Sequence, residues 1–90
     1  MAYVPRLEPR PKAVIEAQPE PFRSFILNAL EQLAAAPTRL SYTNTVIRTG
    51  QLADFKFDEE GVSLWVTIIF QYGQDEQTLF IETIKTEFGG

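Results

Sequence analysis

The chain has 90 residues, a net charge of −4, and neither cysteine nor histidine. A chain of this length supports one hydrophobic core, so a second independent domain is excluded. The two missing residue types exclude disulfides, thiolate chemistry, the Ser-His relay and the usual zinc ligands, and no cofactor is expected.

The charges are distributed unevenly along the chain. Residues 1–50 carry six cations and four carboxylates, whereas residues 51–90 carry two cations and eight carboxylates. Phosphate recognition needs a clustered positive field, so the acidic half argues against nucleic acid as a partner. A basic arm of Arg6, Arg10 and Lys12 is kept as the alternative, in which nucleic acid binds to the start of the chain.

The N-terminal residues show no targeting signal. Residues 1–12 lack the continuous apolar core of a signal peptide. The longest apolar run, Leu33–Ala36, is far shorter than the ~20 residues that cross a bilayer. We therefore expect a cytoplasmic protein with no membrane contact.

Prolines dominate the first part of the chain, since five of the six lie within residues 1–21. Proline lacks a backbone N–H and favours extended or polyproline II backbone. Residues 1–19 are therefore predicted to form an extended arm, in which Ala13–Ala17 adds a short strand, packs across another element or belongs to a partly ordered tail. Residues 20–90 are predicted to form a single α+β domain.

The clearest helix is predicted between Pro21 and Ala36. Its apolar residues follow the i, i+3, i+4, i+7 spacing of one buried helical face. These residues are Phe22, Phe25, Ile26, Ala29, Leu30, Leu33 and Ala34. Pro21 suits a first helical turn, and Pro37 ends the helix because proline disfavours helical backbone at the residue before it.

After Pro37 the period changes from 3.6 to 2, and β-branched and aromatic residues dominate. Four strands are predicted at about residues 39–49, 52–57, 62–72 and 78–88. Gly50, Gly73 and a type I turn over residues 58–61 separate them. Such short connections make neighbouring strands antiparallel. The predicted fold is therefore α+β: one N-terminal helix packed on a four-stranded antiparallel β-meander, preceded by a Pro-rich extended arm.

The hairpins also predict which side chains share a face of the sheet. The face covered by the helix is expected to contain Tyr42, Val46, Ala53, Phe55, Phe57, Val62, Leu64, Val66, Ile68, Phe70, Phe80, Ile84 and Phe88. Glu82 falls on the same face, opposite Ile68. Because an isolated buried carboxylate is costly, we expect Glu82 to lie at the rim or to pair with an arginine.

The opposite face of the predicted sheet combines threonines with an apolar island. Its expected contact residues are Trp65, Ile69, Ile81, Leu79, Ile47 and Thr67. A contiguous exposed apolar patch usually marks an interaction site, and tryptophan is enriched in binding hot spots. The first hypothesis is therefore a non-enzymatic protein-binding module, such as an adaptor, an inhibitor or an accessory subunit.

Two arrangements would cover this island. A protein partner of unknown identity, or a second copy of the chain in a homodimer, would bury Trp65 without any further sequence element. Alternatively, Val14 and Ile15 of the arm cover the island within one chain.

Two further hypotheses concern enzymatic or carrier roles. Asp54, Asp58 and Glu59 cluster around one hairpin and would serve a carboxylate-dependent hydrolase, although acidic turns commonly serve solubility alone. Their spacing matches no dedicated metal-binding loop, so no metal site is assigned. The chain ends in Gly89 and Gly90, which resembles the tails of ubiquitin-like sulfur carriers and modifiers. This resemblance covers two residues and implies an enzyme-linked carrier, whereas a flexible chain end also explains it.

Overall fold

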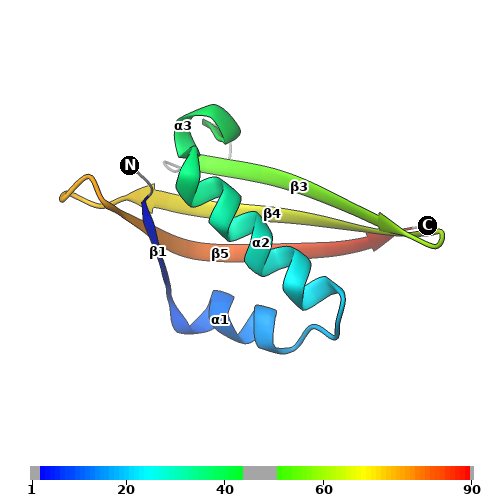
Figure 1. Cartoon of the computed structure of the whole chain (residues 1–90). Coiled ribbons are helices and arrows are strands. Elements are labelled where there is room, and N and C mark those ends of the chain that lie inside the picture. Colours follow the sequence, from blue (N-terminus) through cyan, green and yellow to red (C-terminus); the bar gives the residue numbers. More distant parts are fainter. Residues whose placement is uncertain (1–2, 44–50, 90) are drawn as a thin grey trace.

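The computed structural model of the chain describes residues 3–43 and 51–89. It shows an α+β fold in which α1 and α2 lie on one face of a twisted sheet (Figure 1). The elements in chain order are β1 (Val4–Leu7), α1 (Pro9–Glu16), α2 (Phe22–Ala35), α3 (Pro37–Leu40), β2 (Tyr42–Thr43), β3 (Gln51–Glu59), β4 (Val62–Tyr72) and β5 (Thr78–Gly89). None of the helices within these described residues is long and apolar enough to span a membrane.

The sheet is mixed, with the described strands in the order β1-β5-β4-β3-β2. Strands β2 to β5 form the predicted antiparallel meander. Strand β1 adds to the far edge, parallel to β5, with Val4 opposite Thr78 and Leu7 opposite Ile81. The prediction of a purely antiparallel sheet with a single helix is therefore wrong, because the arm supplies both a strand and a helix.

The predicted extended arm is mostly ordered as β1 and α1. Pro9 and Pro11 lie in the first turn of α1, where backbone N–H groups have no intrahelical acceptor and proline costs nothing. Pro11 and Ile15 are four residues apart, share one helical face and are both buried. The expected short strand at Ala13–Ala17 is wrong for this reason, since these residues continue the helix.

Helix α2 confirms the predicted amphipathic helix, and all seven predicted face residues are buried or half-buried. Its start is held by a residue outside the usual capping position. Glu20 accepts hydrogen bonds from the Ser24 backbone N–H at 2.8 Å and from the Ser24 hydroxyl at 2.5 Å. These bonds favour the ionised carboxylate and hold the pKa of Glu20 below its usual value.

The predicted strand over residues 39–49 differs from the structure. Pro37 stops α2 and also begins the short helix α3, so Arg39 and Leu40 are helical. The chain becomes extended only at β2, and residues 44–50, with Val46 and Ile47, lie outside the described residues.

The β3–β4 connection is a two-residue turn. Glu60 and Gly61 have φ values of 49° and 83°, and Glu59 pairs with Val62. This positive-φ turn matches the right-handed twist of the two strands better than the predicted type I turn. A type I turn over residues 58–61 would place Phe57 opposite Val62, whereas in the structure Phe57 lies opposite Leu64. Because this shift is two residues, each side chain keeps its predicted face.

This turn generates the first testable prediction. Glu60→Asn should stabilise the protein by about 0.5–1 kcal/mol, because asparagine adopts the left-handed region more readily than glutamate. Urea unfolding followed by far-UV circular dichroism measures the difference. The matched substitution Glu59→Asn, one residue earlier in β3, should give no gain, and an equal gain in both variants would contradict the argument.

One irregularity in β5 decides which of its side chains are inside. Ile69 pairs with Thr83 and Phe70 pairs with Ile81, so Glu82 is the extra residue of a β-bulge. The alternation of faces therefore reverses across Glu82, and its side chain is exposed. The prediction that Glu82 lies on the core face is wrong, and no arginine is needed to neutralise it.

The core lies between α1, α2 and the inner face of the sheet. Its buried members are Ile15, Ile26, Ala29, Leu30, Leu33, Ala34, Ala53, Leu64, Val66, Ile68, Phe70, Leu79, Ile81 and Ile84. Phe55 and Phe57 pack against it while partly exposed. Four predicted core residues are exposed instead: Tyr42, Val62, Phe80 and Phe88.

The β4–β5 turn is held by the side chain of Asp75. Its Oδ1 accepts the backbone N–H groups of Gln77 and Thr78, both at 3.0 Å, and its Oδ2 accepts the Thr78 hydroxyl at 2.8 Å. These bonds favour the ionised form and lower the pKa of Asp75 below 3.8. Gly73 leaves space for this carboxylate, because a Cβ there would lie 3.0 Å from Oδ1.

The lowered pKa predicts a pH-dependent contribution to stability. Since the folded-state pKa lies below the unfolded value, the stabilisation is complete above about pH 4 and is lost as pH falls through the folded-state pKa. Asp75→Asn should therefore be less stable than wild type at neutral pH, with a difference that shrinks in acid. Thermal unfolding at several pH values checks this, and a difference independent of pH would contradict it.

Candidate functional site

The sheet has one face that no described helix covers (Figure 1). We call this side the open face; its side chains come from all five described strands. It contains Arg6, Tyr42, Leu52, Asp54, Lys56, Trp65, Thr67, Ile69, Gln71, Phe80, Thr83, Lys85 and Glu87. These positions share a side because directly opposite residues of neighbouring strands project to the same face.

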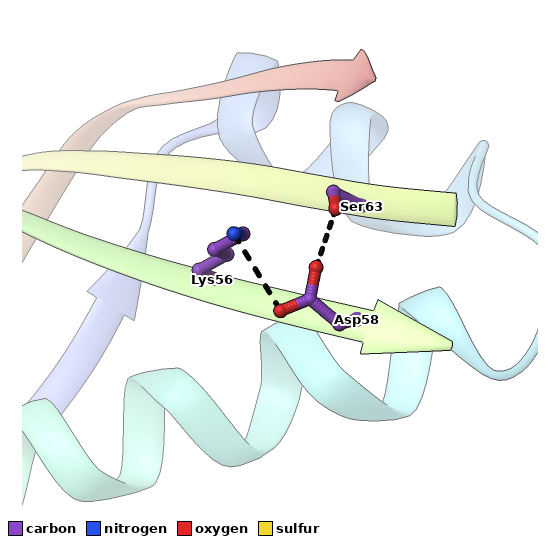
Figure 2. Close-up of polar contacts among 3 residues, drawn as sticks. All are labelled: Lys56, Asp58 and Ser63. Carbon is purple, nitrogen blue, oxygen red and sulfur yellow. Dashed lines mark hydrogen bonds and ion pairs between the residues drawn. The ribbon is translucent and has the colours of Figure 1, made fainter. Parts of the chain in front are cut away.

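Trp65 lies on the open face of β4, near the β3–β4 turn, and its side chain is 47% exposed. Its cross-strand neighbours are Lys56 on β3 and Glu87 on β5. The Lys56 ammonium lies over the indole, 4.6 Å from the ring centroid, and 3.6 Å from Asp58 Oδ2. Figure 2 shows how Asp58 also accepts the Ser63 hydroxyl across the hairpin.

Both contacts of Lys56 are weak. A cation–π contact at an exposed position is worth about 0.5–1 kcal/mol, and an exposed ion pair about 0–1 kcal/mol. Lys56 and Asp58 are 43% and 61% exposed, so solvent screens their attraction. The lysine can leave the indole at low cost, which makes the ring face available to a flat ligand.

Asp54 is the centre of a hydrogen-bond network two residues from Lys56. Its Oδ2 accepts the Tyr42 hydroxyl at 2.6 Å, and its Oδ1 accepts the Thr67 hydroxyl at 2.8 Å. The bond to the carboxylate, with desolvation and the negative charge, raises the pKa of Tyr42 above its usual 10.0. Tyr42 therefore keeps its proton at neutral pH and holds Asp54 in place.

Two hollows adjoin these groups. One of about 360 Å³ is lined by Asp54, Trp65, Thr67, Glu87, Phe88 and Gly89. The other, of about 780 Å³, lies at the opposite end of β3, where Tyr3, Tyr42 and Tyr72 contribute aromatic surface and Glu76 is the charged lining residue. The smaller hollow joins the indole to two carboxylates, so it combines a stacking surface with hydrogen-bond acceptors.

The structure places three predicted contact residues on the open face. Trp65 is exposed, and Thr67 and Ile69 are half-buried between neighbouring strands. Ile47 lies outside the described residues. The apolar island is smaller than predicted, because Leu79 and Ile81 are buried and Leu52, opposite Ile69, is only 5% exposed.

Two predicted contact residues lie in the core and not on the open face. Leu79 and Ile81 are 0% exposed and belong to the core. The bulge at Glu82 reverses the faces of β5, so these residues point toward the helices while Phe80 is on the open face. A strictly alternating pattern could not show this reversal.

The functional side chains that sequence reasoning missed are polar. The sequence suggests Asp54 only as part of a carboxylate cluster with Asp58 and Glu59, it indicates no role for Lys56 or Lys85, and it places Tyr42 in the core. Because residues 37–40 form α3 and not a strand, the alternation predicted from residue 39 does not apply at Tyr42. The hydrogen bonds of Asp54 to Tyr42 and Thr67 depend on the pairing of β3 with β2 and β4. Across residues 3–43 and 51–89, no three acidic side chains gather into a cation-binding group.

The chain is similar to known proteins in structure but not in sequence. The sequence matches no family profile, and no curated protein is similar to it in sequence. Solved structures, in contrast, share its fold. A chain of the toxin–antitoxin complex RelBE2 from Mycobacterium tuberculosis superposes with a TM-score of 0.71 at 11% identity, covering 97% of this chain and 100% of that one.

A mutant of the E. coli toxin RelE in the free state is also similar. Its TM-score is 0.64 at 12% identity, and the match covers 93% of this chain and 82% of that one. At such low identity the likeness shows the fold alone. The chain has the fold of RelE.

This finding corrects the functional predictions from sequence. The neighbours are a toxin and a toxin–antitoxin complex, so the prediction of a generic adaptor, inhibitor or accessory subunit is wrong, and so are the alternatives of a Gly-Gly carrier and a hydrolase. The prediction of a protein without enzymatic activity is overturned by the same likeness. Gly89 also belongs to β5 rather than to a flexible tail.

The Tyr42–Asp54 contact is open to direct measurement. One of the three tyrosines should titrate later than the others in wild type, because Asp54 raises the pKa of Tyr42. In Asp54→Asn this delay should become smaller, since the hydrogen bond to a carboxylate and its negative charge are both lost. Ultraviolet absorbance of the phenolate follows the titration; Thr67→Val, which keeps the charge, should retain the delay, and unchanged titration in Asp54→Asn would contradict the contact.

Proposed function

We propose that the chain is the toxin-type member of a toxin–antitoxin pair and that it cleaves RNA on its open face. The observation that carries this proposal is the likeness to the RelBE2 chain over 97% of this chain and 100% of the other. An almost complete overlap means that the likeness includes the whole sheet and both long helices. The open face supports the proposal because it places an exposed aromatic ring, lysines and a hydrogen-bonded carboxylate on one side of the sheet.

The open face offers what a single-stranded RNA needs. Single strands bind by stacking bases on aromatic rings and by contacts from cations to the backbone. Trp65 supplies the ring, and Lys56, Lys85 and Arg6 supply cations along the sheet. From the row of Trp65 to the row of Arg6 the strands extend by about 20 Å, which is six residues of β4 at about 3.3 Å each.

The carboxylates that make residues 51–90 acidic are not spread evenly over the open face. Most carboxylates of residues 51–89 lie in turns or at strand ends, among them Glu59, Glu60, Asp75 and Glu76. Directly opposite residues of neighbouring strands form rows across the open face. Lys56 is in one row with Glu87, and Lys85 is in the next row with Asp54, so each lysine has a carboxylate two residues away on its own strand. A short segment of RNA needs only these local cations, whereas a long duplex would need a continuous positive groove.

Asp54 is the residue best suited to start RNA cleavage. The 2′-hydroxyl oxygen forms a bond to the neighbouring phosphorus while the bond from phosphorus to O5′ breaks. Asp54 takes the hydroxyl proton, and solvent water at this exposed face gives a proton to O5′. Tyr42 and Thr67 hold the carboxylate by hydrogen bonds. Lys56 lies two residues from Asp54 along β3, and Lys85 lies two strands across the sheet from it, so either cation would offset the charge on a phosphate bound over this part of the sheet.

The partner in this proposal is a protein antitoxin that blocks the open face. Complementary charge favours correct association, and around Trp65 the open face holds the cations Lys56 and Lys85 and the carboxylates Asp54 and Glu87. We therefore expect the contacting segment of the antitoxin to carry charges of both signs. The homodimer expected from sequence stays a prediction.

A cleavage assay tests the proposal. Purified protein, with and without ribosomes, should convert messenger RNA into fragments with 2′,3′-cyclic phosphate ends, and its expression in cells should arrest growth. Asp54→Asn should lower the cleavage rate by at least ~100-fold, the usual contribution of a general base. Glu59→Gln, a carboxylate change at the end of the same strand, should keep the rate.

The proposal would be contradicted if folded wild-type protein produced no fragments under either condition. Equal rates for wild type and Asp54→Asn would keep RNA cleavage and reject Asp54 as the base. Circular dichroism of each variant confirms that it is folded.

A further inference from the structure

We infer that the hollow at Trp65 binds one RNA base and that Glu87 selects bases with an amino group over uracil. This inference rests on the proposed RNA substrate and names the part of the substrate that is read. It comes from the lining of the 360 Å³ hollow, where an exposed indole and two carboxylates meet.

Trp65 offers an aromatic surface on which a base can stack. The indole is exposed on an open sheet, and its strand neighbours keep it at the wall of the hollow. Only Lys56 lies over the ring among the described residues, and its contacts are those of an exposed lysine. When a base replaces the ammonium on the ring, Lys56 remains close to the phosphate of the same nucleotide, which is the partner that its charge prefers.

The edge of the base would meet acceptors. Glu87 lies directly opposite Trp65 on β5, and within residues 3–43 and 51–89 it has no hydrogen-bond or ion-pair partner. Asp54 lines the same hollow, with each carboxylate oxygen already receiving one hydroxyl hydrogen bond. An ionised carboxylate only accepts hydrogen bonds, so Glu87 is the free acceptor that would read the base.

Acceptors discriminate between bases by the donors on the base edge. Cytosine carries an amino group at the position where uracil carries a carbonyl oxygen. Glu87 would accept a hydrogen bond from this amino group, whereas the uracil oxygen would face a second negative acceptor. Adenine and guanine also carry amino groups, so uracil is the one base that offers Glu87 no amino donor. Because cytosine and uracil have nearly the same shape, they isolate the effect of this one group.

Trp65 provides a direct readout, since it is the single tryptophan of the chain. Short oligomers of deoxycytidine and of deoxyuridine lack the 2′-hydroxyl and therefore remain uncleaved during a titration. We expect deoxycytidine oligomers to quench the tryptophan fluorescence with a Kd about 5- to 150-fold lower than deoxyuridine oligomers, the range of a good base-edge contact.

Variants of exposed residues separate the steps. Glu87→Gln offers both a donor and an acceptor, so the ratio of the two Kd values should fall to about 1. Glu82→Gln, a carboxylate change at the exposed bulge of the same strand, should leave the ratio unchanged. Lys56→Gln should weaken both oligomers alike and reduce the salt dependence of binding, because it removes a phosphate contact and not a base contact.

Equal Kd values for the two oligomers in wild type would overturn the inference, as would an unchanged ratio in Glu87→Gln. Absence of any quenching would overturn it as well. These results are distinct from a failure of the proposed function, which is decided by RNA cleavage: cleavage with no preference between cytosine and uracil rejects this inference alone. Selective quenching without cleavage rejects the proposed enzyme and keeps the base site.

Discussion

One extra residue in β5 fixes the division between the core and the open face. Because Glu82 has no cross-strand partner, the residues on its two sides change faces without any break in the strand. Leu79 and Ile81 then join Ile84 in the core, and Phe80 goes outside. A regular strand would place the same side chains the other way and leave two large aliphatic residues in water, so the hydrophobic effect holds the bulge in place.

The same bulge sets the environment of the first strand. Residues 78–81 lie beyond it and pair in parallel with β1, and the chain then returns over the core as α1. Ile15 of α1 packs in the cluster that includes Ile81, so β1 and α1 belong to the folded domain and are not an appendage. Because α1 and α2 cover one face of the sheet, the other face stays accessible and carries Asp54, Lys56, Trp65 and Lys85.

Sequence periodicity was sufficient for the elements whose contacts are local. Helix α2 and strands β3 to β5 are where the apolar spacing puts them, and the exposed Trp65 follows from simple alternation along β4. Three features could not be found in this way. The parallel pairing of β1 joins residues more than 70 positions apart, the bulge breaks the alternation itself, and prolines that suit a first helical turn also suit extended chain. The Tyr42–Asp54 contact depends on the pairing of β2 with β3, which no spacing rule gives.

Net charge is a poor guide to what such a small domain can bind. Coulomb attraction between exposed charges falls off within about 10 Å at moderate salt, so a ligand at Trp65 responds mainly to the groups in its own two rows. Those rows hold Lys56 and Glu87, then Asp54 and Lys85, a balanced set on an acidic protein. Such a set attracts long polyanions weakly but can orient one nucleotide, with its phosphate toward a lysine and its base edge toward a carboxylate. Weak general attraction combined with local orientation favours selectivity for a short RNA segment over tight binding along its length.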